Sequence, residues 1–324
     1  MVSQARTAGR AFRVWRIQRQ LDSDVDGLSA NKQENLGRHL ARTDGGGGEA
    51  YDDLAAIDSD AADALVRIQD PLIERQFVDA YRRGEVDDEQ LASALRRYDE
   101  LDADRKGTAD EVIDETGASG VKLLARMDGD GLRRVLDLDI KRADEFRAAA
   151  ARNLEGGYAT TGDIDNFARY ADNLEGIDGL NSGPVSDFIT ASDPGNVKGA
   201  LREVRRADEI GAENIERMSL ESSAGELDIQ TKSGKIVESK STFGYNEQNV
   251  DAELRKKLTA MRDDPRVSFD GNTLRVIATK VDDRNMVKTK IKKWENKVES
   301  ESEWNNANIQ IKVVDERTET TIKN

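Results

Sequence analysis

The sequence contains no cysteine, and His39 is its one histidine. Without cysteine the chain has no disulfide framework, no thiolate zinc site and no thiol nucleophile. A single histidine excludes zinc sites built from several histidines and argues against Ser-His-Asp catalysis. We therefore expect any chemistry of this protein to depend on carboxylates, lysine, hydroxyl groups or a metal ion held by oxygen.

Long apolar runs are also missing. Hydrophobic residues make up 37% of the chain and aromatic residues 5%, which is enough for modest cores. No stretch approaches the roughly 18 apolar residues that indicate a membrane-spanning helix. Residues 1–20 carry regularly spaced arginines and lack the apolar segment of a signal peptide. The sequence thus predicts no membrane span and a location that is cytoplasmic or secreted without a signal peptide.

Charge is abundant but unevenly distributed. Charged residues make up 35% of the chain, and the formal net charge is −15. Residues 197–324 hold 24 basic and 24 acidic residues, whereas residues 1–196 hold 25 basic and 40 acidic residues and carry the whole net charge. Such a shift predicts units with different partners. The acidic, arginine-rich part also suits a halophilic protein, with an ordinary acidic cytosolic protein as the alternative.

Glycine, proline and apolar spacing divide the chain into segments. The glycines at 45–48 predict a flexible linker, since no Lys-Ser or Lys-Thr follows them to form a phosphate-binding loop. Pro184 and Pro194 fall in a stretch rich in turn-forming residues, which predicts the main domain boundary. Segments 64–77 and 124–136 resemble each other and hint at a repeated two-helix unit. We expect a basic helix and Gly-rich linker over 1–48, an all-α spacer or interaction domain over 51–180, a linker over 181–196, and a further domain over 197–324.

The periodicity of the apolar residues changes after the predicted boundary. Helices are predicted over 197–210, 248–262 and 283–298. Strands are predicted over 215–221, 226–231, 235–240, 273–280 and 308–314. The predicted fold class is therefore α+β, with an all-α N-terminal region followed by a small α-β-β-β-α-β mixed sheet flanked by helices.

The most informative segment is the strand pair around the turn at Ser233 and Gly234. Alternation along a strand places Asp228 opposite its apolar neighbours, and it places Glu238 and Lys240 on one common face. A tight turn can bring Asp228 beside Glu238. Two carboxylates so close repel each other unless a cation lies between them, and hard oxygen ligands suit Mg²⁺ or Mn²⁺. The ammonium of Lys240 can then stabilise charge on a phosphate or orient an attacking water.

The run Glu226-Leu-Asp228, nine further residues and then Glu238-Ser-Lys240 resembles the PD-(D/E)xK motif of the restriction-endonuclease-like nuclease superfamily. The resemblance covers residues 197–314 and includes the order of the elements. It implies a Mg²⁺ (or Mn²⁺) ion held by Asp228, Glu238 and an acidic residue of the preceding helix, with Lys240 beside the hydrolytic water. No proline precedes Asp228, a departure that many members share.

Two further site residues are implied by the same resemblance. Glu203, in the preceding helix, matches the place of the third metal ligand, and Glu209 is the alternative. Gln248, early in the following helix, matches a glutamine that completes the site in some members. The motif by itself is a weak pattern in a chain so rich in charge. A solvated hairpin carrying ion pairs and an inactive relative are therefore the alternatives.

Lysines gather around Trp294 in the neutral part of the chain. A basic helix that includes an aromatic residue can follow a phosphate backbone. The alternative is a solvated helix face whose Trp294 belongs to the core. The predicted nucleic-acid contacts are Lys256, Lys257, Lys288, Lys290, Lys292 and Lys293.

The resemblance implies a Mg²⁺-dependent endonuclease that hydrolyses phosphodiester bonds of nucleic acid, with DNA expected over RNA. A long helical, glycine-punctuated region ahead of a small catalytic module resembles polymorphic toxins. That architecture implies an intermicrobial effector with an immunity protein as its partner. The alternatives are a restriction or recombination endonuclease and, from another class, a helical scaffold or virion-associated protein that binds nucleic acid without cutting it.

Overall fold

The computed structural model describes Leu21 and residues 28–43, 46–304 and 306–324. The chain forms two compact units, the first comprising residues 1–137 and 144–165 and the second residues 138–143 and 166–324. The predicted basic helix of residues 1–20 lies outside the described residues. The fold class is α+β, as predicted, with an all-α region followed by a mixed sheet. Across the described ranges, every helix is too short or too polar to cross a bilayer.

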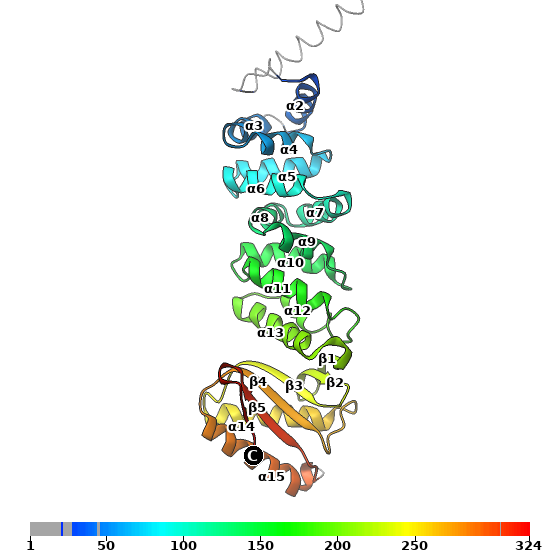
Figure 1. The fold of residues 1–324 in the computed structure, drawn as a ribbon, viewed down its shortest axis with the longest axis vertical. Helices are drawn as coiled ribbons and strands as arrows, with labels where there is room; N and C mark the ends of the chain where they lie inside the picture. The colour runs from blue at the N-terminus through cyan, green and yellow to red at the C-terminus, as the bar shows by residue number, and fades with distance from the viewer. Residues whose placement is uncertain (1–20, 22–27, 44–45, 305) are drawn as a thin grey trace, which may run out of the picture. The chain divides into compact units, whose positions relative to one another are not determined.

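The first unit is a stack of short helices (Figure 1). Several of its helices begin at an aspartate whose side chain accepts a hydrogen bond from a main-chain N–H of the first turn, as at Asp58, Asp70, Asp87 and Asp102. Such caps satisfy donors that have no partner within the helix, so part of the acidity of this unit defines where helices start. The helices are α2 (Ala30–Arg42), α3 (Gly46–Ile57), α4 (Ser59–Arg67), α5 (Pro71–Arg82), α6 (Asp88–Asp99), α7 (Ala103–Thr116), α8 (Ala118–Arg126), α9 (Gly129–Asp137) and α10 (Ala143–Glu155).

Ion pairs join residues about one helix pair apart along this stack. Arg67 pairs with Asp99, 32 positions later, at 2.8 Å. Four more pairs have sequence separations between 31 and 33: Lys32–Asp63, Arg105–Asp137, Lys122–Glu155 and Arg134–Asp165. An offset that recurs in five ion pairs is what a repeated two-helix unit produces. Two other pairs of the stack, Asp58–Arg96 and Glu115–Arg152, have separations of 38 and 37.

Three of the four glycines predicted to form a flexible linker instead begin a helix, and Gly45 lies outside the described residues. Gly46–Ile57 is α3, so glycines 46–48 form its first turn. A Cβ on Gly47 would clash with the side chains of Thr43 and His39. Nε2 of the buried His39 lies 2.9 Å from the carbonyl oxygen of Gly47, and its Nδ1 lies 2.8 Å from Glu74 Oε1. Glycine is therefore needed here for close packing between α2 and α3.

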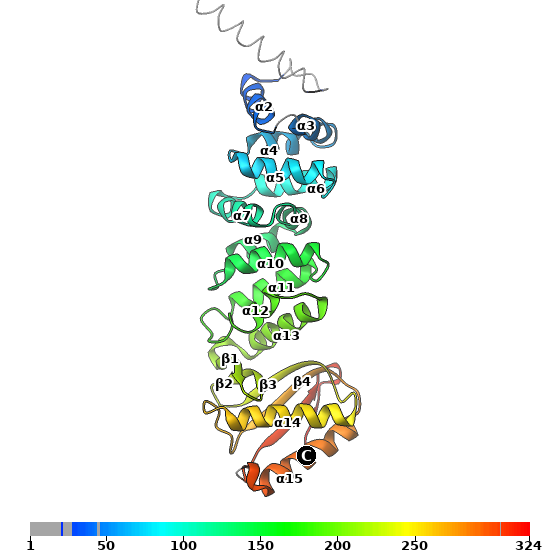
Figure 2. The same cartoon turned by 180° about the vertical axis from the view of Figure 1, so that it is seen from behind.

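The second unit contains the last part of α11 (Thr161–Asp172), four further α-helices and a six-stranded sheet in the order β1-β2-β3-β4-β5-β6 (Figures 1 and 2). The two pairs β1–β2 and β2–β3 are antiparallel, β3–β4 and β4–β5 are parallel, and β5–β6 is antiparallel. The elements are α12 (Pro184–Ile189), α13 (Pro194–Ile210), β1 (Ile215–Ser222), β2 (Gly225–Thr231), β3 (Ile236–Phe243), α14 (Glu247–Asp263), β4 (Thr273–Val281), α15 (Arg284–Ser300), β5 (Gln310–Asp315) and β6 (Thr320–Ile322).

Residues 181–196, predicted to be a linker, contain α12 and the start of α13, so the structure differs from that prediction. Pro184 and Pro194 each occupy the first turn of a helix, and Asp193 caps the second of these helices. Proline favours this position because its missing N–H would have no partner there and its φ angle already suits a helix. Val185 and Phe188 of α12 are fully buried. The two prolines therefore mark helix starts within the second unit.

Helices α14 and α15 cover the same face of the sheet (Figure 2). Their apolar sides bury Leu254 and Leu258 of α14 and Ile291 and Trp294 of α15 in a common core with strand residues such as Ile311. Helix α13 packs against β3. The hairpin β2–β3 is thus held between α13 and α14.

Candidate active site

The β2–β3 hairpin brings Asp228 and Glu238 together. Gln230 pairs with Ile236 across the hairpin, and each carboxylate lies two residues further from the turn, so both are on the same face. The main-chain N–H of Asp228 donates to Glu238 Oε1 at 3.2 Å, and that of Ser239 donates to Asp228 Oδ2 at 2.7 Å. Side-chain oxygens thus replace carbonyl partners between the two strands, which fixes both carboxylates against the main chain.

A lysine from α14 lies against this pair of carboxylates. Glu238 is fully buried at 0% exposure, Asp228 is 6% exposed and Lys257 is 4% exposed. Nζ of Lys257 forms an ion pair with Glu238, lies 3.4 Å from Asp228 Oδ1 and donates to the carbonyl oxygen of Glu226 at 2.6 Å. The ammonium therefore occupies the place where the two carboxylates need a positive charge.

The pKa values of Glu238 and Lys257 are both raised, but for different reasons. Burial raises the pKa of Glu238 well above its ordinary value, the charge of Asp228 adds to this, and Lys257 and Lys240 oppose it. Burial also opposes the charged form of Lys257, but Glu238 and Asp228 outweigh burial, so the pKa of Lys257 is raised. The lysine consequently stays protonated and neutralises the carboxylates.

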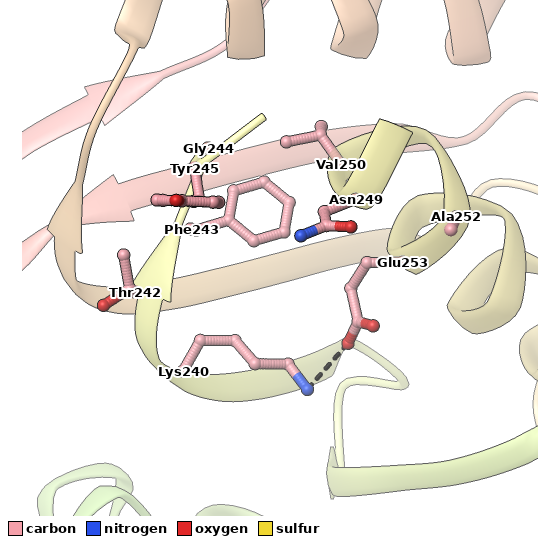
Figure 3. Close-up of a pocket in the computed structure, with 9 residues that line it drawn as sticks. All are labelled: Lys240, Thr242, Phe243, Gly244, Tyr245, Asn249, Val250, Ala252 and Glu253. Carbon is pink, nitrogen blue, oxygen red and sulfur yellow. Dashed lines mark ion pairs between the residues drawn. The ribbon is translucent and has the colours of Figure 1, made fainter. Parts of the chain in front are cut away.

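Lys240 lies on the same strand face as Glu238, as predicted from their spacing. Its Nζ forms an ion pair at 2.7 Å with Glu253 Oε1 on α14 (Figure 3). The same Nζ lies 4.0 Å from Glu238 Oε2. Burial and the nearby Lys257 disfavour its charged form, but the carboxylates outweigh them and the pKa of Lys240 is raised. Lys240 is therefore an ammonium at neutral pH, suited to stabilising negative charge and not to accepting a proton.

Glu203 of α13 belongs to the same electrostatic environment. Burial first, and then the charges of Asp228, Glu226, Asp187 and Glu238, raise its pKa to about 9. The alternative residue Glu209 instead pairs with Arg205 and Arg206. Within the residues that the structure describes, no three acidic, histidine or cysteine side chains are placed to hold a metal ion.

Gln248 is exposed in the first turn of α14. Glu253, further along the same helix, is the α14 residue that reaches Lys240. The structure thus gives the position beside Lys240 to a carboxylate that the sequence did not single out.

The predicted nucleic-acid contacts divide into two groups. Lys257 is buried beside the carboxylates, and Lys290 is buried in ion pairs with Glu247 and Asp251. These two placements correct the prediction, because both side chains are buried and paired with carboxylates of the same unit. Trp294 is in the core, and its Nε1 donates to Asp251 at 2.9 Å. The exposed lysines of the predicted set are Lys256, Lys288, Lys292 and Lys293.

The sequence prediction gave no role to Asp187, Glu226 or Glu253, and it assigned Lys257 to nucleic acid instead of to the carboxylates. Burial and then the charge of Asp228 raise the pKa of Asp187 on α12. Burial also raises the pKa of Glu226, partly offset by the nearby hydroxyl of Ser219 and by the charge of Lys257. Glu226 is two residues from Asp228, so strand alternation could have placed it on the same face. Glu253 and Lys257 are four residues apart on α14, a spacing that puts them on one helix face, whereas nothing local signals Asp187.

Comparisons of this chain with protein-family models, with curated proteins and with solved structures found no match. The geometry of the site and the resemblance of its motif therefore carry the functional interpretation.

Proposed function

We propose that the second unit is a metal-dependent nuclease that hydrolyses phosphodiester bonds of nucleic acid, as the resemblance to the PD-(D/E)xK superfamily implies. The observation that carries the proposal is the meeting of Asp228 and Glu238 on one face of a buried hairpin, with Lys240 next on that face. A fold that buries two adjacent carboxylates has to supply positive charge to them, and buried, mutually perturbed acids are typical of functional sites.

The donor set suits a hard divalent cation. Asp228 and Glu238, which meet on the hairpin, would hold Mg²⁺ or Mn²⁺ through carboxylate oxygens, and Glu203 of α13 would have to move toward them to complete the ligand set. Glu238 Oε2 is buried and accepts no hydrogen bond, although Lys257 lies beside it. Such an ion would supply Lewis-acid stabilisation of the charge that develops on the phosphate.

The residues of the chain have distinct roles in this proposal. Lys240 is protonated, so its ammonium stabilises negative charge on the phosphate. Glu253 forms an ion pair with Lys240 and so limits where its Nζ can lie. Lys257 balances the charge of Asp228 and Glu238, so the site keeps its geometry without an ion. The exposed lysines at positions 256, 288, 292 and 293 would attract the phosphate backbone.

Lys257 also favours a second candidate, a domain that binds nucleic acid without cutting it. In that case the ammonium permanently neutralises the two carboxylates, and the acidic pair has only a structural role. Binding would then depend on salt but not on divalent ions.

Cleavage assays on the full chain test the proposal. Plasmid DNA and transfer RNA would be incubated with the protein in Mg²⁺, in Mn²⁺ and in EDTA. We expect metal-dependent cleavage that is lost in Asp228→Asn, Glu238→Gln and Lys240→Met and retained in the matched control Glu299→Gln on the exposed side of α15. Unchanged cleavage in all three site variants would refute the nuclease, and salt-sensitive binding without cleavage would establish the second candidate.

The proposed biological role is that of an intermicrobial effector with an immunity protein, and a restriction or recombination endonuclease is the alternative. What supports it is the long helical region that precedes the catalytic module. Expression of the full chain in a bacterial host should prevent colony formation, and Glu238→Gln should restore it. Normal growth with the active chain would argue against an effector.

A further inference from the structure

A pocket of about 340 Å³ opens directly beside Lys240 (Figure 3). The end of β3 and the first turns of α14 form its walls, and Lys240 and Glu253 belong to both the pocket and the carboxylate site. Phe243 is a buried apolar wall, and Thr242 and Asn249 add polar groups. A mixed lining of this size is typical of a site for a small, flat and partly polar group.

Tyr245 is the unusual member of this lining. It is 79% exposed, and among the described residues it is the one large exposed hydrophobic side chain of the second unit. The preceding Gly244 has a φ of +83°, and a Cβ there would come within 2.8 Å of Val287 Cγ2. Glycine therefore lets the chain turn close to α15 immediately before Tyr245. The ring of Tyr245 is therefore exposed to solvent and does not belong to the hydrophobic core.

One face of α14 connects the pocket to the carboxylates. Asn249, Glu253 and Lys257 follow each other at four-residue spacing, which places them in one row along the helix. Asn249 lines the pocket, Glu253 pairs with Lys240, and Lys257 contacts Asp228 and Glu238. A ligand with a flat polar group and an adjoining anionic group could follow this row.

We propose that the pocket receives an unpaired base of a single-stranded nucleic acid, stacked on Tyr245, while the adjoining phosphate lies against Lys240. This inference rests on the proposed function and adds a substrate preference to it. Aromatic rings accept any base by stacking, and a lysine beside the ring matches the phosphate that follows. The amide of Asn249 and the hydroxyl of Thr242 offer donors and acceptors to a base edge. A paired base presents neither its face nor its pairing edge, so duplex should not enter the pocket.

Binding measured without cleavage tests the inference. The probe is a short oligothymidylate with one 2-aminopurine, added to the full chain in EDTA, and the same strand annealed to its complement serves as the duplex. The variants are Tyr245→Ala and, as a matched control that keeps the ring, Tyr245→Phe. We expect the fluorescence of 2-aminopurine to fall on binding to the parent protein and to Tyr245→Phe. In Tyr245→Ala, affinity for the single strand should drop roughly 5- to 150-fold while duplex affinity is unchanged.

Several outcomes would refute the proposal that the pocket binds an unpaired base. These are no single-strand binding by the parent protein, equal single-strand affinity in Tyr245→Ala, or equal losses for single strand and duplex. A folding check by circular dichroism separates misfolding from lost contact, and we expect no change because Tyr245 is exposed. Cleavage in Mg²⁺ is scored separately. A fluorescence change that depends on the Tyr245 ring, without any cleavage, would refute the nuclease proposal and support base binding in the pocket. Cleavage together with binding that does not depend on the ring would support the nuclease and refute base binding in the pocket.

Discussion

Replacing Lys257 by methionine tests the central feature of the site. Methionine keeps much of the length of the side chain and removes its charge. Asp228 and Glu238 would remain buried without their ammonium, and the carbonyl oxygen of Glu226 would lose the hydrogen bond at 2.6 Å. Removing one partner of a buried ion pair costs about 3–5 kcal/mol of unfolding free energy. We expect a loss of this size for Lys257→Met at pH 8.

The loss should depend on pH because Glu238 can take up a proton. Its pKa is already raised well above the ordinary 4.5 by burial and by Asp228, and removal of Lys257 raises it further. A carboxyl whose pKa is higher in the folded state lowers stability as pH rises between the unfolded and folded pKa values. The deficit of Lys257→Met should therefore be smaller at pH 5 than at pH 8.

Urea unfolding followed by tryptophan fluorescence measures this effect. Trp294 and Trp304 are both buried in the second unit and report its unfolding. Lys290→Met is the matched control, because Lys290 is also buried but its partners Glu247 and Asp251 are more exposed. We expect the control to lose no more than about 1 kcal/mol. Equal stability of Lys257→Met and the parent protein at pH 8 would refute the role given to the ammonium.

Added Mg²⁺ extends the test. If Asp228 and Glu238 ligate the ion, it can replace the missing ammonium in Lys257→Met. At a Mg²⁺ concentration of 100 times the Kd, binding would then restore about 2.7 kcal/mol of unfolding free energy. The parent protein should gain less, because its lysine already contacts both carboxylates. Equal stabilisation of the two proteins by Mg²⁺ would contradict a shared position for ion and lysine.

Three further predictions concern other residues. The pKa of Glu203 is raised to about 9, so the metal-free protein should lose stability as pH rises from 5 to 9. Urea unfolding midpoints measured against pH should show this loss, and Glu203→Gln should make it smaller. An unchanged pH profile in Glu203→Gln would contradict the burial of Glu203 beside the other acids. Lys240→Met should reduce single-turnover cleavage by roughly 100-fold or more while Mn²⁺ binding, followed by electron paramagnetic resonance, stays within a few-fold of the parent protein. Gly47→Ala should destabilise the first unit by about 1–3 kcal/mol through its clash with Thr43 and His39, seen as a lower melting temperature, and an unchanged melting temperature would show that α3 can shift.

Local patterns in the sequence predicted much of the second unit. The order from α13 to β5 follows from residues that alternate with a period of two in strands and about 3.6 in helices. The same alternation placed Glu238 and Lys240 on one face, and the Ser-Gly turn predicted the hairpin that joins Asp228 to Glu238. The strand β6 was missed because Thr320–Ile322 is too short to show any period.

Other features depend on tertiary packing and could not be predicted locally. In the sequence, Lys257 resembles any lysine on a charged helix. Only the packing of α14 against the hairpin places its ammonium beside Glu238. The glycines at 46–48 resemble a linker because nothing local shows that α2 packs against them. Pro194 follows an aspartate that caps the helix, so the pair begins α13 where composition alone suggested a break.

The recurring offset of five ion pairs in the first unit has a consequence for how that unit can change in length. Several helices are linked to the next helix but one by ion pairs with this offset, such as Arg67–Asp99 and Arg105–Asp137. Nearest-neighbour coupling of this sort makes stability close to a sum over modules. Gain or loss of one whole module would leave the remaining junctions intact, so such a scaffold can be lengthened or shortened in evolution by duplication without redesign of its joints.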